Sequence, residues 1–366
     1  MSKVRHNAAF ICLYSWGLVM TLATAARTFV PVSGTFNVWE LMSQIVAASY
    51  FIVAMAKMME IIKNRNNLAA ILKRFKELWP QKVDTEIEKN IVETYMMKNT
   101  IWMTRYAYLS ISCFLTVNST PLFVMLIEYL SGGDVKLMVP FSAWYPYDEY
   151  AKFVYPFTYI YLFYGSHVGS ASSICFDVLF CILLSHLSMH YKLLRQDLIS
   201  SVKTIRNTGS GSLVDQCRSE ITLLKCVEKH QCLIEIRNKM DDIFTNMIFF
   251  NFICSTFNMC IVGFFLMVQD GFGKIKFVIM FATLMSQIFL LCWYGQELVD
   301  NKFRKMIVYM MHNSQQPQKL IAMKFWEVSL TSFSKLCSAS WSYFALLNTI
   351  LGEIVRVIKP EGGLLT

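Results

Sequence analysis

The sequence predicts an all-α membrane protein with seven transmembrane helices. Of its 366 residues, 55% are apolar and only 16% are charged, whereas soluble globular chains carry about 25% charged residues. Uncharged apolar runs, several of them close to the roughly 20 residues that cross a bilayer, recur along the chain. These two observations exclude an ordinary soluble domain and favour one polytopic unit whose solvent is lipid.

The apolar runs define seven candidate spans. The first is as long as a full span and lacks a small-residue cleavage site, so we expect a retained helix rather than a signal peptide. The fourth is uncharged apart from His167 and is prolonged by residues 178–189. The seven spans are 7–26, 41–56, 106–127, 153–176, 243–269, 277–296 and 336–352.

Three polar, helix-prone segments separate these spans. Residues 57–105 alternate apolar and basic residues at helical spacing, which predicts an extension of the second span followed by an amphipathic connector. Residues 190–242 are similar, and "NTGSGS" at 207–212 predicts a flexible turn within them. Residues 298–335 form the third such segment.

The distribution of Lys and Arg predicts the orientation. If the N-terminus is cytosolic, 27 of the 34 Lys and Arg fall on the cytosolic side and 7 on the outer side. Short cytosolic loops are enriched in these residues, so the asymmetry favours a cytosolic N-terminus and an extracellular C-terminus.

Seven spans alone would suggest a G-protein-coupled receptor, but that family has its N-terminus outside. The Asp-Arg-Tyr and Asn-Pro-x-x-Tyr motifs usual in its third and seventh spans are missing. All 11 cysteines lie in predicted spans or inner segments, where we expect packing residues or reduced thiols and no disulfide.

Four motifs, in order and spacing, resemble those of the insect odorant receptor family. "KLCSASWSYFALL" at 335–347 is similar to the family's last-helix signature, and "WYPYD" at 144–148 is similar to its outer-loop motif. "LLCWYGQELVDNKFR" at 290–304 and "MKFWEVSLTSFSKL" at 323–336 resemble its later inner segments. The chain lacks the long inner insertion of the shared coreceptor, so it resembles an odour-specific tuning subunit.

The resemblance implies an odorant-gated, nonselective cation channel of four subunits, here a heterotetramer with the odorant coreceptor. It places the protein in the plasma membrane of a sensory neuron dendrite. It implies four parts: helices one to six with the ligand pocket (1–297), a cytosolic anchor (298–335), a pore-lining helix (336–358) and an extracellular tail (359–366). A gustatory-type channel of the same fold is the alternative, although its usual last-helix Thr-Tyr and Gln-Phe are absent.

The last span carries a narrow polar stripe. At about 100° per residue, one edge roughly 80° wide holds one leucine and four polar residues, which are Ser338, Ser342, Leu346, Thr349 and Glu353. Four such edges around an axis would make a wetted pore with one apolar collar, which gates ions by dewetting. The resemblance aligns the family's gate residue with Leu346 and a pore-facing polar residue with Thr349.

One alternative to this pore stays open, and so does the role of Glu353 within it. The hydroxyls would also serve as small residues for tight helix packing. Glu353, expected near the outer mouth, would concentrate cations as part of a ring of carboxylates, unless Arg356, one turn away, neutralises it.

A small, volatile, mostly apolar ligand needs a buried cavity with few polar groups. Residues that share helix faces at similar membrane depth are the candidates, with ordinary bundle packing as the alternative. His167 would donate to a ligand oxygen or bond a neighbouring helix as a neutral histidine. The candidate residues are Ser43, Val46, Tyr50, Cys113, Val117, Tyr159, Phe163, His167, Met280, Leu284 and Gln287.

Other chemistry has no support in the sequence. We find no catalytic pair, metal cluster or phosphate-binding loop, and so expect no enzyme activity, metal or cofactor. The net charge of +9 fits cytosolic segments that face anionic lipid rather than nucleic acid. Asp177, deeper in the fourth span, is expected to join an inner polar network rather than bind ligand.

Overall fold

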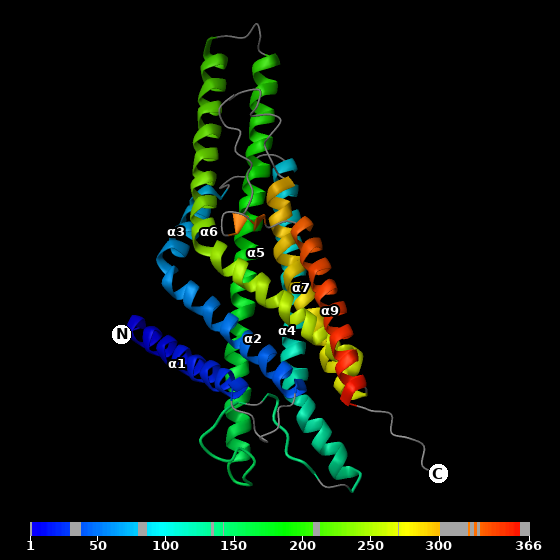
Figure 1. Cartoon of the computed structure of the whole chain (residues 1–366). Helices are drawn as coiled ribbons and strands as arrows, with labels where there is room; N and C mark the ends of the chain where they lie inside the picture. Colours follow the sequence, from blue (N-terminus) through cyan, green and yellow to red (C-terminus); the bar gives the residue numbers. More distant parts are fainter. Residues whose placement is uncertain are drawn as a thin grey trace.

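The structure, a computed structural model, is a bundle of long helices (Figure 1). It describes residues 2–29, 38–79, 86–132, 135–141, 143–207, 213–269, 271–300, 321–322, 326–327 and 330–358. The helices are α1 Ser2–Phe29, α2 Val38–Lys63, α3 Arg65–Leu78, α4 Glu86–Leu130, α5 Tyr155–Asn207, α6 Leu213–Val268, α7 Phe272–Asp300 and α9 Leu330–Ile358. Within the described residues, the strands are one short antiparallel pair, β1 Ile321–Ala322 and β2 Trp326–Glu327.

Each of the seven expected spans corresponds to a helix of its own, although the fourth begins two residues before α5 and the fifth ends one residue after α6. Five helices, α2, α4, α5, α6 and α7, are long and apolar enough in their described residues to cross a membrane. The first and last expected spans fall in α1 and α9. The membrane-protein fold follows from these five helices, while the count of seven crossings and the orientation stay predictions.

Helices α4, α5 and α6 are longer than the spans within them, at 45, 53 and 56 residues. α4 continues from the expected connector into its span without a break, because its polar part is rich in good helix formers such as Glu, Lys and Met. Of the expected turn at 207–212, Asn207 is the last residue of α5, and residues 208–212 lie outside the described residues. Most of the expected anchor segment, 298–335, also lies outside them.

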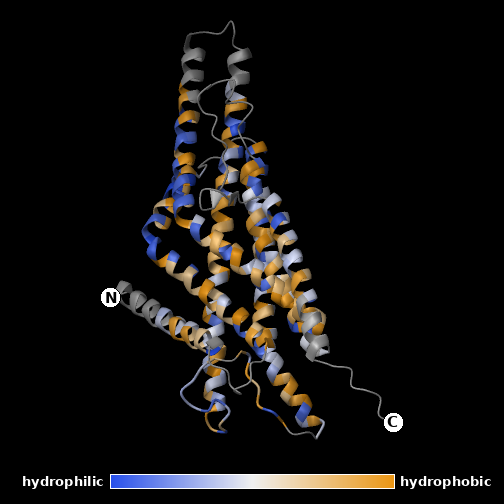
Figure 2. Ribbon diagram, viewed as in Figure 1, coloured by the Kyte–Doolittle hydropathy of each residue, from blue (hydrophilic) through white to orange (hydrophobic). Residues whose placement is uncertain are grey.

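α5 is the central helix of the bundle, in contact with α1, α2, α4, α6 and α7. Its residues Leu183, Leu184 and Leu187 are fully buried in the main hydrophobic core, where they pack with Phe244 of α6 and Ile288 of α7. Hydrophobic residues dominate the middle of the bundle, and hydrophilic residues gather on α3 and the adjoining part of α6 (Figure 2). The core therefore aligns the helices that enclose the site.

The loop between α4 and α5 folds back onto the end of the bundle. The Trp144 amide donates to the Ala23 carbonyl at the end of α1, at 2.9 Å. Arg27 Nη2 lies 3.8 Å from Oε1 of Glu149, whose side chain is buried. Burial raises the pKa of Glu149 and the Arg27 guanidinium opposes that rise. The loop is thus fastened to α1 and holds Pro140 and Phe141 over the interior of the bundle.

Methionine side chains fit against two glycines where α1 joins the bundle. Met55 of α2 lies against Gly17 of α1, and the fully buried Met20 of α1 lies against Gly165 of α5. Small residues allow close helix approach in membranes. A Cβ at residue 165 would lie 2.6 Å from Met20 Cε and 2.9 Å from Met20 Cγ, so any larger residue there would force Met20 to move.

We expect Gly165→Ala to destabilise the purified receptor, because overpacking of this kind costs about 1–3 kcal/mol. The measurement is the melting temperature of the receptor in detergent, which is monitored as the loss of monodisperse protein on heating. Gly263→Ala is the matched control, since a Cβ there meets only ordinary contacts at 3.7 and 3.8 Å. Adding Met20→Ala to Gly165→Ala should recover part of the loss. An unchanged melting temperature for Gly165→Ala would contradict this packing.

Candidate functional site

Five helices and one loop enclose a cavity of about 240 Å³. α2, α4, α5, α6 and α7 form its walls, and Pro140 and Phe141 of the α4–α5 loop also line it. Most of its surface is hydrocarbon and aromatic, from side chains such as Val46, Phe265 and Leu284, with scattered hydroxyl and amide groups. This composition is typical of a pocket for a small, mostly apolar molecule.

Hydrogen bonds between helices fix the walls of the cavity. Ser49 Oγ of α2 donates to Asn258 Oδ1 of α6 at 2.7 Å. The Tyr50 hydroxyl of α2 and the Ser170 hydroxyl of α5 are 2.9 Å apart. Because Tyr50, Ser170 and Asn258 all line the cavity, these bonds set its width as well as joining α2 to both neighbours.

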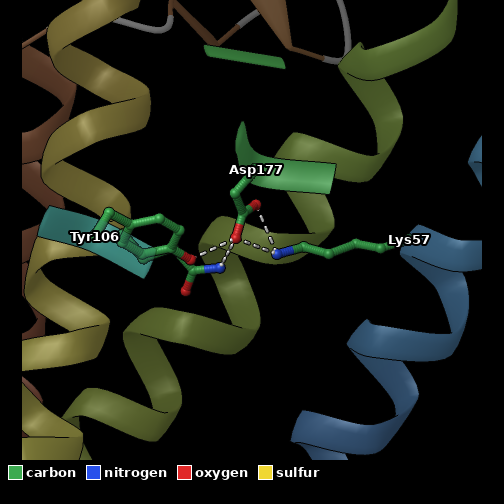
Figure 3. A network of polar contacts seen from close by, with 4 residues as sticks. Lys57, Tyr106 and Asp177 are labelled. Atoms are coloured by element: carbon green, nitrogen blue, oxygen red, sulfur yellow. Dashed lines mark hydrogen bonds and ion pairs between the residues drawn. The ribbon is translucent and has the colours of Figure 1, made fainter. Parts of the chain in front are cut away.

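At one end of the cavity, four residues form a buried network around Asp177 (Figure 3). Lys57 Nζ lies 2.8 Å from Asp177 Oδ1 and 3.0 Å from Oδ2. The Tyr106 hydroxyl and Gln287 Nε2 donate to Oδ2 at 2.8 and 2.7 Å. The network joins α2, α4, α5 and α7, and Lys57, Tyr106 and Gln287 line the cavity.

The network is almost completely removed from water. The side chain of Lys57 is 0% exposed and that of Asp177 is 3% exposed. A buried charge is tolerated only when it is paired and its remaining hydrogen-bonding capacity is used. Asp177 meets this condition because it accepts four hydrogen bonds from residues of three helices. These contacts agree with the expectation that Asp177 joins a polar network rather than binds ligand.

The structure brings eight of the eleven candidate ligand residues to the cavity. They come from α2, α4 and α7, on which a spacing of three or four residues keeps side chains on one face. The eight are Ser43, Val46, Tyr50, Cys113, Val117, Met280, Leu284 and Gln287. Their contact with a ligand stays a prediction.

The three candidates from α5 do not line the cavity. Tyr159 donates its hydroxyl to the Asn118 carbonyl, while Phe163 and His167 are exposed beside Phe114, with ring centroids 5.2 and 5.6 Å apart. Each four-residue step turns about 40° around a helix, so this series drifts off the cavity face. α5 presents instead a face that includes Ser166, Ser170 and Ser173.

Apart from Gln287, sequence reasoning missed the charged and amide groups of the cavity, among them Lys57, Asn251 and Lys276. Lys57 and Lys276 stand at the edges of apolar runs, Lys57 at the start of the inner segment 57–105 and Lys276 just outside the sixth span, 277–296. The presence of Asp177 beside a span was a usable signal, because a carboxylate at that depth requires a cationic partner. Asn251 carried no such signal.

The polar stripe of α9 lies on the face turned away from the bundle. α9 packs on α6 and α7, and Cys260 Sγ donates to the carbonyl of the buried Ser340 at 3.2 Å. On the other side Ser338, Ser342, Leu346 and Thr349 are exposed, Leu346 by 56%. The Glu353 side chain lies outside the described part of the chain.

Two hydroxyls of the stripe bond to their own helix. Ser342 Oγ donates to the Ser338 carbonyl at 3.0 Å, and Thr349 Oγ1 donates to the Ala345 carbonyl at 2.9 Å. Their lone pairs remain directed outward and are free to accept hydrogen bonds from water. This part of α9 can therefore face water or a neighbouring subunit.

No group of three or more His, Cys, Asp or Glu side chains within the described residues could hold a metal ion. The nine cysteines whose side chains the structure describes are free.

Comparisons with known proteins agree on one family. A family model described as 7tm Odorant receptor matches residues 37–302. Two Drosophila melanogaster proteins, Putative odorant receptor 85d and Odorant receptor 85c, are each 25% identical to the chain, over 323 and 330 residues. The aligned regions cover 82% of this chain and 76% and 80% of those proteins.

Solved structures share the fold. The insect olfactory receptor OR5 from Machilis hrabei superposes with a TM-score of 0.76, at 17% identity, over 93% of this chain and 88% of that one. The same receptor in complex with eugenol gives a TM-score of 0.77, also at 17% identity, over 96% and 91%.

Replacing Lys57 with Met should strongly destabilise the fold, because the remaining carboxylate of Asp177 is left buried and unpaired. The expected loss is about 3–5 kcal/mol, measured as reduced cell-surface expression and a lower melting temperature. The double variant Lys57→Met with Asp177→Leu should recover much of the loss. Lys89→Met, which removes an exposed pair with Glu93, should be neutral. A single variant as stable as wild type would refute this role.

Proposed function

The chain belongs to the 7tm odorant receptor family, and from this premise we propose that it is an odorant-gated subunit of a nonselective cation channel. Its matched relatives are individual odorant receptors, not the shared coreceptor. The ligand is a small volatile molecule that binds within this chain's own helical bundle. The chain is a receptor in a family without enzymes, and the proposal includes neither cofactor nor metal.

The observation that carries the proposal is that the cavity and α9 share two supporting helices. α6 and α7 contribute Asn251, Val262, Phe265 and Met280 to the cavity wall, among others, and α9 packs on both of them. A ligand that pushes α6 and α7 apart, or draws them together, moves the surface on which α9 packs. Binding energy is therefore converted into a shift between closed and open arrangements, provided that the ligand prefers one of them.

The cavity supports a ligand of modest size. Its volume of about 240 Å³ suits a molecule of small volatile type, and its apolar walls supply most of the binding free energy through burial of hydrocarbon. We propose that the eight predicted residues that line it contact the ligand. Tyr159, Phe163 and His167 are left out of this set.

The exposed edge of α9 supports a pore. With the last helices of four subunits around an axis, Ser338, Ser342 and Thr349 of this chain would lie along its part of a wetted wall, and Leu346 would form its part of an apolar collar. A hydrophobic constriction blocks ions by dewetting, and a small outward rotation rehydrates it. Glu353 is proposed to lie at the outer mouth of this pore.

The proposed assembly is a heterotetramer with odorant coreceptor subunits in the plasma membrane of a sensory neuron dendrite. Seven helices cross the membrane, the N-terminus is cytosolic and the C-terminus extracellular, and lipid surrounds the bundle. Residues 1–297 hold the ligand pocket, 298–335 form the cytosolic anchor, 336–358 line the pore and 359–366 form the tail.

Filling the cavity should change which odorants open the channel. We expect Val46→Phe and Met280→Phe to reduce responses to the larger agonists by about tenfold or more and to reorder the ranking, because each adds volume to a pocket with little spare space. The measurement is a set of concentration–response curves for volatiles, with the chain co-expressed with its coreceptor. His167→Ala should leave the ranking unchanged, and a reordered ranking for that variant would contradict the cavity assignment.

Removing the proposed apolar collar should open the channel without ligand. Leu346→Ser is expected to raise the ligand-free current severalfold, since a hydroxyl at the narrowest point lowers the cost of wetting. Leu346→Met, which retains hydrocarbon, and Leu347→Ala, about 100° away around the helix, are the controls. Equal baseline currents in Leu346→Ser and wild type, at equal surface expression, would remove Leu346 from the gate.

A further inference from the structure

The charges that face the cavity do not cancel. Two lysines, Lys57 and Lys276, and no aspartate or glutamate are among the described residues that line it. Lys57 is neutralised by Asp177, which lies behind the lining at 2.8 and 3.0 Å. Lys276 forms no ion pair with any carboxylate in the described part of the chain. One positive charge is therefore left without a counter-charge at the wall.

Lys276 lines the cavity from α7, and its ammonium is close to another lining side chain. The ammonium lies 5.3 Å from the centroid of the Phe277 ring, which also lines the cavity. Cys113 of α4 is another lining residue of the cavity. Lys274, two residues earlier, is exposed and does not line the cavity. α7 therefore carries one lysine that lines the cavity, Lys276, and one that lies on the surface, Lys274.

Several neutral polar groups of the wall already use their protons, although Ser110 Oγ and Asn251 Nδ2 have no hydrogen-bond partner among the residues that the structure describes. Ser43 Oγ donates to the Glu40 carbonyl and Thr283 Oγ1 donates to the Ile279 carbonyl, at 3.0 and 2.8 Å. The Tyr106 hydroxyl and Gln287 Nε2 donate to Asp177. Against this background Lys276 is the one cationic donor on the wall that a ligand could pair with, within the described residues.

Building on the proposed function, we infer that the cavity selects ligands with a carboxylate at one end and a small apolar body. The carboxylate pairs with Lys276, and the hydrocarbon lies against side chains such as Val46, Met280 and Leu284. Hydrogen bonds between two charged groups are about twice as strong as neutral ones. The ligand also supplies the counter-charge that this lysine lacks, which a neutral odorant cannot do.

A matched pair of probes, hexanoate and methyl hexanoate at neutral pH, tests the charge directly, because the two share one alkyl body. Binding is measured as ligand-induced thermal stabilisation of the purified full chain in lipid nanodiscs, and gating as current in cells that also express the coreceptor. We expect hexanoate to bind roughly 30-fold more tightly than its ester.

Three variants locate the effect. Lys276→Met should abolish the preference for hexanoate, with ester binding changed less than threefold, and Lys276→Arg should retain the preference. Lys274→Met is the control for a general loss of positive charge and should behave as wild type. Equal binding of acid and ester by wild type, or equal losses for both probes in Lys276→Met, would overturn the inference.

Failure of the channel proposal would look different. If neither hexanoate nor any volatile changes the current, while hexanoate still stabilises the purified chain in a Lys276-dependent way, the acid site stands and the channel proposal falls. If esters and alcohols open the channel and hexanoate gains nothing from Lys276, the channel proposal stands and the acid site falls.

Discussion

A single carboxylate inside the bundle constrains how its helices can be arranged. Asp177 sits where water is excluded, so its charge must be balanced by protein. Lys57 from α2, Tyr106 from α4 and Gln287 from α7 supply that balance to a residue of α5. Any rearrangement that separates these helices exposes an uncompensated charge to a medium of low dielectric, and the four are thereby fixed in one register at the end of the cavity.

The cavity and the exposed edge of α9 occupy opposite sides of the same pair of helices. α6 and α7 contribute side chains to the cavity on one side and a packing surface for α9 on the other. Tightly packed interiors are bistable rather than continuously deformable, so small displacements at one side reappear at the other.

The sequence predicted the helices well because uncharged runs of sufficient length have few alternatives. It also predicted the wall residues of α2, α4 and α7, since these helices have one face with recognisable spacing. The prediction of cavity residues failed on α5, because its aromatic residues occur on every side of the helix. A high density of Tyr and Phe therefore does not indicate which face lines the cavity, and His167 lies outside it. Lys57 and Lys276 were missed because a lysine at the edge of an apolar run looks the same whether it turns outward or into the bundle.

The methionine contacts of α1 have a chemical consequence. Met20 is fully buried against Gly165, and Met55 is nearly so against Gly17. Oxidation turns a thioether into a bulkier, polar sulfoxide that no longer fits such a niche. An oxidant reaches these sulfur atoms when α1 separates from the bundle. The rate of sulfoxide formation at Met20 and Met55, measured by mass spectrometry, therefore reports how often that separation occurs.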